Sequence, residues 1–159
     1  MKSLFVITII SALLYACSGN TNSSNSTSTN DTSGAKSVNP DAISQYDPHR
    51  GEGKFSNVEV GPLNVTMADA GKKVYDVKCS SCHKLTNEKL VGPGWSGITQ
   101  KQTPEWIMNF ITNPDAMIDK DPELQAQLEI CLVRMPNQNL NDEDARSVLE
   151  FMRKNDGVK

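Results

Sequence analysis

The sequence predicts an all-α domain, and three features predict it. Apolar residues recur at the three- and four-residue spacing of a helix face in several segments. Thr103-Pro104 and Asp121-Pro122 each place a capping side chain before a proline, as at the first turn of a helix. No run alternates polar and apolar residues as a half-buried strand does, and no internal repeat is present. With 159 residues, 37% of them hydrophobic, the chain has material for one modest core.

Residues 1–16 have the pattern of a secretory signal peptide. Lys2 supplies a positive start, and a largely apolar run over residues 4–14 is too short to span a membrane. The Leu-Tyr-Ala-Cys sequence that ends at Cys17 resembles a bacterial lipobox, although Tyr15 stands where a small residue is usual. We therefore expect export and lipidation of Cys17. The alternative is plain cleavage that leaves an ordinary thiol.

Residues 17–40 are expected to form a lipid anchor and a disordered polar linker. From 18 to 33 nearly every residue is Ser, Thr or Asn, which leaves nothing to bury. Residues 41–65 read as an irregular extension. The residues that would lay it against the domain surface are Tyr46, Phe55 and Leu63. A flexible chain from Cys17 to Val65 has a root-mean-square span of about 35–40 Å, enough for a small domain to reach several partners near one membrane.

Residues 66–159 are expected to form the domain, which begins with a helix. Thr66 is its predicted N-cap, Asp69 completes a capping box, and the helix ends near Lys78. The spacing of its apolar residues, Ala70, Val74, Tyr75 and Val77, suits a helix better than a strand.

Three further helices follow. One begins after Thr103 and is stopped by Asn113-Pro114, and the next begins after Asp121. Asn141 caps the last helix, whose acidic first turn and basic last turn match its dipole. The apolar residues expected to face inward are Trp106, Ile107, Phe110, Ile111, Leu124, Leu128, either Cys131 or Leu132, Ala145, Val148, Leu149 and Met152, with Phe151 beside the last group.

The five residues from Cys79 to His83 form a Cys-x-x-Cys-His motif at the end of the first helix. In such a motif the two thiols add to the vinyl groups of a haem to give thioethers. The following histidine becomes the proximal ligand of the iron. We predict one haem c attached through Cys79 and Cys82, with His83 on the iron.

Other uses of this motif are a zinc site, a redox dithiol or a chance disulfide. A structural zinc site needs a second pair of ligands, and only Cys131 and His49 remain. A thioredoxin-like dithiol follows a strand, whereas a helix is predicted before Cys79. Covalent haem is the favoured interpretation.

Met135 is the predicted sixth ligand of the iron. Met108 and Met152 fall on amphipathic helices, where methionine usually fills the core, and Met117 sits in a predicted loop without supporting context. Met135 precedes a proline that stiffens the chain and three amide side chains that can hold the thioether. A soft sulfur ligand favours Fe(II) and raises the reduction potential.

Together these residues resemble the class I cytochromes c of bacteria, over roughly the last ninety residues. The matching residues are Gly71, Tyr75, Cys79, Cys82, His83, Gly92-Pro93, Met135-Pro136, Val148 and Phe151. The resemblance implies a small fold in which the first and last helices cross around one haem, where Gly71 and Tyr75 meet Val148 and Phe151. It also implies that Pro93 packs near the haem, with a nearby carbonyl accepting the imidazole N–H of His83.

Further polar and aromatic residues admit two interpretations each. Trp95 and Trp106 are candidates to donate to a haem propionate; otherwise Trp106 is core and Trp95 partly exposed. Cys131 is expected to be a small buried hydrophobe rather than a reactive thiol, and His49 to be solvated. The lysines that cluster around the motif form either a docking patch or an ordinary solvated face: Lys72, Lys73, Lys78, Lys84 and Lys89.

The predicted function is single-electron transfer outside the cytoplasm. A net charge of −3 gives no basic footprint for nucleic acid, and we find no reactive side chain that would make the chain an enzyme. We expect a lipid-anchored shuttle in a Gram-negative periplasm, carrying electrons from a quinol-oxidising complex to a terminal reductase or oxidase. Asp76 to Met152 is similar to small cytochromes of Bacteroidetes that accompany nitrous oxide reductase, which implies that enzyme as acceptor.

Two alternatives come from other classes. A haem peroxidase or gas-binding sensor requires either a second haem motif or an open position on the iron, and Met135 argues against an open position. A subunit fixed in a larger complex has little use for a long polar linker.

Overall fold

The computed structural model describes residues 46–159, and within these residues the regular secondary structure is helical. The helices are α2 (Val65–Lys78), α3 (Ile98–Lys101), α4 (Pro104–Thr112), α5 (Pro114–Ile118), α6 (Pro122–Cys131) and α7 (Asp142–Asn155). The described residues contain no strand, only an isolated bridge between His83 and Lys89. The all-α prediction is confirmed. None of these helices is long and apolar enough to cross a bilayer.

The predicted signal peptide (1–16), the lipidation site Cys17 and the linker (17–40) lie outside the described residues, as do the first five residues of the extension. These expectations are taken up below as proposals.

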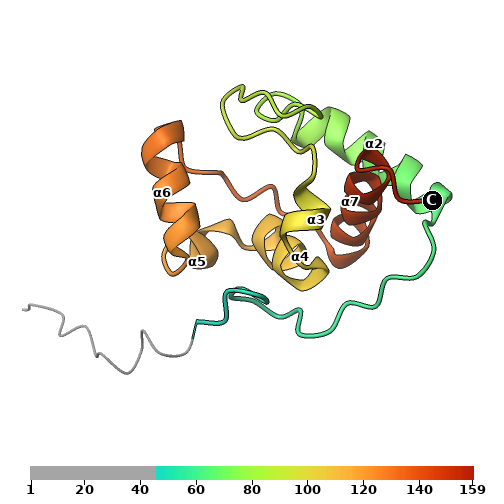
Figure 1. The fold of residues 1–159 in the computed structure, drawn as a ribbon, viewed down its shortest axis with the longest axis horizontal. Helices are drawn as coiled ribbons and strands as arrows, with labels where there is room; N and C mark the ends of the chain where they lie inside the picture. The colour runs from blue at the N-terminus through green and yellow to red at the C-terminus, as the bar shows by residue number, and fades with distance from the viewer. Residues whose placement is uncertain (1–45) are drawn as a thin grey trace, which may run out of the picture. The chain divides into compact units, whose positions relative to one another are not determined.

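Helices α2 and α7 cross in close contact (Figure 1). A Cβ built at Gly71 would clash with the carbonyl oxygen of Ser147, so only glycine lets the two backbones approach this far. One helical turn on, the ring centroids of Tyr75 and Phe151 lie 5.4 Å apart. The crossing of the first and last helices is therefore confirmed.

The start of α2 differs from the prediction. Its N-cap is Asn64, whose side chain accepts a hydrogen bond from the backbone N–H of Met67 at 3.0 Å. Asn64 and Thr66 are both good capping residues, and sequence alone did not separate them. Asp69 does not complete a capping box; it pairs with Lys154 of α7 at 2.8 Å. The Gly71 contact fixes the rotation of the helix, which leaves Val77 83% exposed.

The three later helices begin where the sequence predicts. Thr103, Asp121 and Asn141 each accept a hydrogen bond from a backbone N–H of the first turn. The short helices α3 and α5 were not predicted. The proline of Asn113-Pro114 ends α4 and then occupies the first position of α5, a place where its missing N–H costs nothing.

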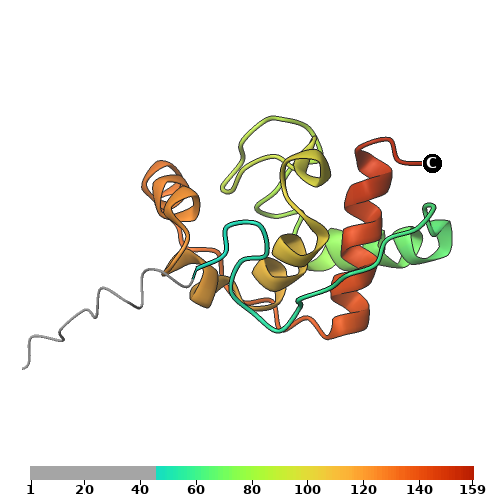
Figure 2. The same cartoon turned by 60° about the horizontal axis from the view of Figure 1, so that its bottom comes forward.

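Residues 46–64, which we call the strap, lie across α4 and α7 (Figure 2). The side chain of Asn109, fully buried in α4, accepts from the N–H of Phe55 and donates to its carbonyl, both at 2.9 Å. Arg153 of α7 donates to the carbonyl of Gly61 at 2.6 Å, and Tyr46 donates to Asp121. Tyr46, Phe55 and Leu63, the residues expected to lay this stretch against the domain, all contact it. The flexible span estimated from Cys17 to Val65 is therefore too long.

Candidate haem site

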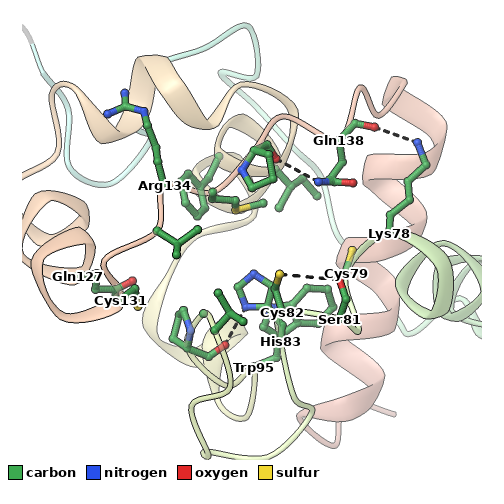
Figure 3. A pocket seen from close by; sticks show the side chains of 18 of the residues that line it. Lys78, Cys79, Ser81, Cys82, His83, Trp95, Gln127, Cys131, Arg134 and Gln138 are labelled. Atoms are coloured by element: carbon green, nitrogen blue, oxygen red, sulfur yellow. Dashed lines mark hydrogen bonds between the residues drawn. The ribbon is translucent and has the colours of Figure 1, made fainter.

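The loop between α2 and α3, residues 79–97, carries the Cys-x-x-Cys-His motif; we call it the attachment loop. Cys79 closes α2, with its N–H donating to Tyr75 O at 2.9 Å. The N–H groups of Cys82 and His83 both donate to Cys79 O at 3.0 Å. This tight turn brings two thiols and an imidazole to one side of a cavity (Figure 3). Both cysteines are free thiols, and burial raises the pKa of Cys79 to about 11.

Two cavities of about 280 and 730 Å³ meet at this loop. His83, Pro93, Trp95 and Met135 line both of them, while Cys79 and Cys82 line the smaller one. Their volumes fall within or close to the range of about 300–1,000 Å³ usual for cofactor and ligand sites. The donor set of this cavity, two free thiols, an imidazole and a thioether, fits a covalently attached haem.

The imidazole of His83 has a fixed orientation. Its Nδ1 lies 2.8 Å from the carbonyl oxygen of Pro93. A carbonyl only accepts, so we assign the proton to Nδ1, which leaves Nε2 with a free lone pair for a metal. Burial lowers the pKa of His83, and the Pro93 hydrogen bond acts in the opposite direction. A Cβ at Gly92 would lie 2.5 Å from Cε1 of the ring, so Gly92-Pro93 forms the wall behind the imidazole.

Met135 lies in residues 132–140, a segment without regular structure that we call the Met135 loop. Met135 is half-buried and lines both cavities. Met108 and Met117 are buried in the core, and Met117 lies in α5 rather than in a loop. Met152 is also buried but lines the larger cavity from α7. Among the described methionines, therefore, Met135 and Met152 share a cavity with His83.

The two tryptophans have different surroundings. Trp106 donates its indole N–H to Asp121 at 3.1 Å within the core, so that N–H is already engaged. Trp95 is buried, so of its two interpretations the partly exposed side chain is wrong. Its ring lies 4.9 Å from that of Tyr75 and 5.6 Å from that of His83, between centroids. Tyr75 in turn donates to the carbonyl of His83 at 2.7 Å.

Four of the five lysines around the motif have partners of their own. Two form ion pairs with a carboxylate four residues on, and two donate to main-chain carbonyls on the other side of the cavity. These contacts are Lys72–Asp76, Lys84–Glu88, Lys78–Gln138 O and Lys89–Ile130 O. Carboxylates balance the charges of Lys72 and Lys84, whereas Lys78 and Lys89 keep their positive charge beside the cavity, because a carbonyl is neutral.

Cys131 is not a buried hydrophobe as expected: it is partly exposed and lines the smaller cavity beside Gln127 (Figure 3). His49 is exposed, at the rim of the larger cavity. Sequence reasoning did not single out Arg134, which precedes Met135 and pairs with Asp115 and Asp119. A charged residue beside the methionine, and two aspartates four residues apart, were the available signal.

Beyond this motif, no three His, Cys, Asp or Glu side chains in residues 46–159 are grouped so that they could hold a metal ion. A family model described as "Cytochrome c" matches residues 68–156. No curated protein matches the chain.

Two solved structures from Rhodothermus marinus are similar to this chain. A cytochrome c from that organism is 28% identical, with a TM-score of 0.63. The similarity covers 65% of this chain and 90% of that one. An engineered form bound to a carbene intermediate is also 28% identical over the same shares, with a TM-score of 0.59.

Proposed function

Because this chain belongs to the cytochrome c family, we propose that it shuttles single electrons between membrane-associated redox partners through one haem c. The haem is attached through Cys79 and Cys82, and when bound it supplies an iron that gains and loses one electron. The chain's own residues hold the haem, keep water away from it and offer a surface to partners. The engineered relative's carbene chemistry belongs to that protein, and we propose no enzyme activity here.

Four side chains are proposed to bind the haem, and one carbonyl orients one of them. The thiols of Cys79 and Cys82 fix the cofactor, and Nε2 of His83 is the proposed proximal ligand. Pro93 O holds the proton at Nδ1, which keeps the imidazole neutral and increases its basicity. Met135 is the proposed sixth ligand. The observation that carries the proposal is that His83 and Met135 line the same cavity as the two free thiols.

Two axial protein ligands favour electron transfer over the alternatives. A peroxidase or a gas sensor must bind a small molecule on the iron, which requires an open position. With Met135 on the iron, that position is closed to exogenous ligands.

The surface beside Cys82 is apolar. Exposed apolar side chains come from the ends of α2 and α6 and from the attachment loop: Val77, Leu90, Val91, Ile130, Leu132 and Val133. Three of them, Val77, Val91 and Val133, line the smaller cavity. Exposed apolar groups near a redox centre suit a brief encounter with a small interface. We propose that partners dock here, over these exposed apolar side chains.

The proposed setting is the periplasmic face of a Gram-negative membrane, with a lipid at Cys17. The proposed donor is a quinol-oxidising complex, and a nitrous oxide reductase is the terminal acceptor to test first. Mixing reduced protein with each candidate acceptor in a stopped-flow instrument should show reoxidation that saturates with acceptor. Equal, slow rates with all acceptors would contradict a dedicated partner. Replacing Cys17→Ser should release the protein from membranes, and retention would argue against the lipid.

The absorption spectrum of the oxidised holoprotein tests the ligand set. We expect a low-spin haem with the weak long-wavelength charge-transfer band of a methionine-ligated iron, and loss of this band in Met135→Ala. Met152→Leu is the matched control and should keep the band. A high-spin spectrum in the wild-type protein would exclude the shuttle and favour an enzyme or sensor.

A further inference from the structure

The Met135 loop is held to the domain in an unusual way. Helix α6 ends at Cys131, and Leu132 then turns the chain with a left-handed φ of 59°. Within the described chain, no residue from 133 to 140 takes part in a backbone–backbone hydrogen bond. The position of Met135 therefore depends on packing and on hydrogen bonds made by side chains.

The ties on the two sides of Met135 differ. After it, Asn137 donates to the carbonyl of Thr112 at 3.3 Å, and Gln138 O accepts from Lys78 at 2.9 Å. Before it, the polar ties of residues 133 and 134 all come from Arg134.

Arg134 forms three hydrogen bonds with residues of helix α5 and its C-cap. Its Nε donates to Asp115 Oδ1 at 2.7 Å, and its Nη2 donates to Asp119 Oδ1 at 2.5 Å and to the carbonyl of Asp115 at 3.2 Å. Helix α5 is itself well anchored, because Met117 and Ile118 are buried in the core. A planar guanidinium with several fixed donors defines a direction as well as a distance, which a single ammonium does not.

We propose that Arg134, through Asp115 and Asp119, is a positioning residue for the axial ligand: it holds the Met135 loop so that the thioether stays on the iron. This inference rests on the proposed role of Met135. The Arg134 side chain is 40% exposed, so its ion pairs are screened by salt and contribute modestly. The contacts of Arg134 with Asp115 and Asp119 therefore favour the closed loop but still allow it to open.

Titration of the oxidised holoprotein with imidazole measures loop opening, since imidazole reaches the iron only when Met135 leaves it. We expect the Arg134→Ala protein to bind imidazole about 3- to 10-fold more tightly than the wild type. This is the change expected when one partly exposed ion-pair network no longer holds the loop closed. Arg134→Lys should fall between the two, because one ammonium cannot reproduce the fork. The double variant Asp115→Asn/Asp119→Asn should match Arg134→Ala, and adding Arg134→Ala to it should change little.

Lys120→Ala is the matched control. It removes the same charge and an ion pair of similar exposure, Lys120–Glu52, and neither partner forms a hydrogen bond or ion pair with the Met135 loop. We expect its imidazole affinity to equal that of the wild type. An Arg134→Ala protein that binds imidazole within twofold of the wild type, while Met135→Ala binds it far more tightly, would overturn this inference alone. If Met135→Ala binds imidazole no more tightly than the wild type, the proposed ligand role of Met135 fails instead.

Discussion

His83 and Met135 face one cavity from segments that are fixed to the domain in different ways. The attachment loop is held by main-chain hydrogen bonds, including those from Gly92 N to Cys82 O and from Trp95 N to Lys84 O, both 2.9 Å. The Met135 loop is held by side chains, several of them exposed. Side-chain ties are screened and replaced more easily than main-chain ones. We therefore expect the His83 side to hold a bound haem in place, and the Met135 side to be where ligand binding to the iron can be adjusted.

The attachment loop also rests on the more rigid part of the fold. It follows α2, which crosses α7 around Gly71, and α7 contains the fully buried Glu150. Arg153 donates to Glu150 at 2.6 Å, Arg146 donates to the same oxygen, and Asn64 N donates to the other at 3.2 Å. This cluster joins the end of the strap to α7 and has no counterpart in the Met135 loop.

Removing the buried carboxylate should have the largest effect. We expect Glu150→Ala to lower the free energy of unfolding by about 3–5 kcal/mol, because it leaves Arg153 buried without its anion. Urea unfolding of the holoprotein measures this. Asp142→Ala, which breaks the exposed Lys54–Asp142 pair, is the control and should cost less than about 0.5 kcal/mol. Equal losses in the two variants would contradict a rigid α2–α7 side.

A methyl group added at the helix crossing should cause the second-largest loss of stability. Gly71→Ala forces α2 away from Ser147 and should cost about 2 kcal/mol, since overpacking outweighs the gain in helix propensity. Gly61→Ala places its methyl in open space and should be close to neutral. Thermal unfolding of both holoproteins checks this, and a stable Gly71→Ala protein would show that the crossing tolerates separation.

Acid should weaken the α2–α7 side through Glu150. Burial alone would raise the pKa of this carboxyl, but the hydrogen bonds from Arg146, Arg153 and Asn64 N outweigh it and hold the pKa below its ordinary value. A depressed folded-state pKa gives stability that is present above the unfolded-state pKa, about 4.3 for Glu, and is lost as the pH falls through the folded value. Unfolding free energy should therefore fall more steeply below about pH 4.3 in the wild type than in Glu150→Gln. Parallel curves would contradict this.

The smallest effect on stability is expected in the Met135 loop. Lys78→Met removes the hydrogen bond to Gln138 O but keeps the apolar stem, and should change unfolding by less than about 1 kcal/mol. Imidazole should nevertheless bind the oxidised haem more tightly, by about two- to threefold, which separates loop opening from global stability. Lys72→Met, whose ion pair stays within α2, should leave imidazole binding unchanged. Unchanged imidazole binding in Lys78→Met would show that the hydrogen bond to Gln138 O does not hold the Met135 loop closed.

Local signals in the sequence predicted much of the fold. Thr103, Asp121 and Asn141 lie next to the backbone groups they cap, so their role is visible within four residues. The strap was not predictable in this way. Its partners Asn109 and Arg153 are polar residues on amphipathic helices, where a polar side chain ordinarily indicates a solvated face.

The site shows the same division. The attachment motif is a contiguous pattern, and the hydrogen bond from His83 to Pro93 O, ten positions on, was implied by the resemblance to class I cytochromes c. The contacts of Arg134 and Lys78 join residues 15 to 60 positions apart, and the charge of a surface residue does not by itself identify a partner that far along the chain. Long-range side-chain ties hold the Met135 loop, so this was the part of the site that sequence did not describe.

A potentiometric titration of the wild-type holoprotein beside Met135→His tests the central claim most directly, since that claim is one haem carried between His83 and Met135. We predict a single one-electron transition in the wild type. In Met135→His the potential should be lower by on the order of 0.1–0.3 V, because imidazole stabilises Fe(II) less than a thioether does and axial ligands span about 0.8 V. A Met135→His protein with the wild-type potential would show that Met135 is not on the iron.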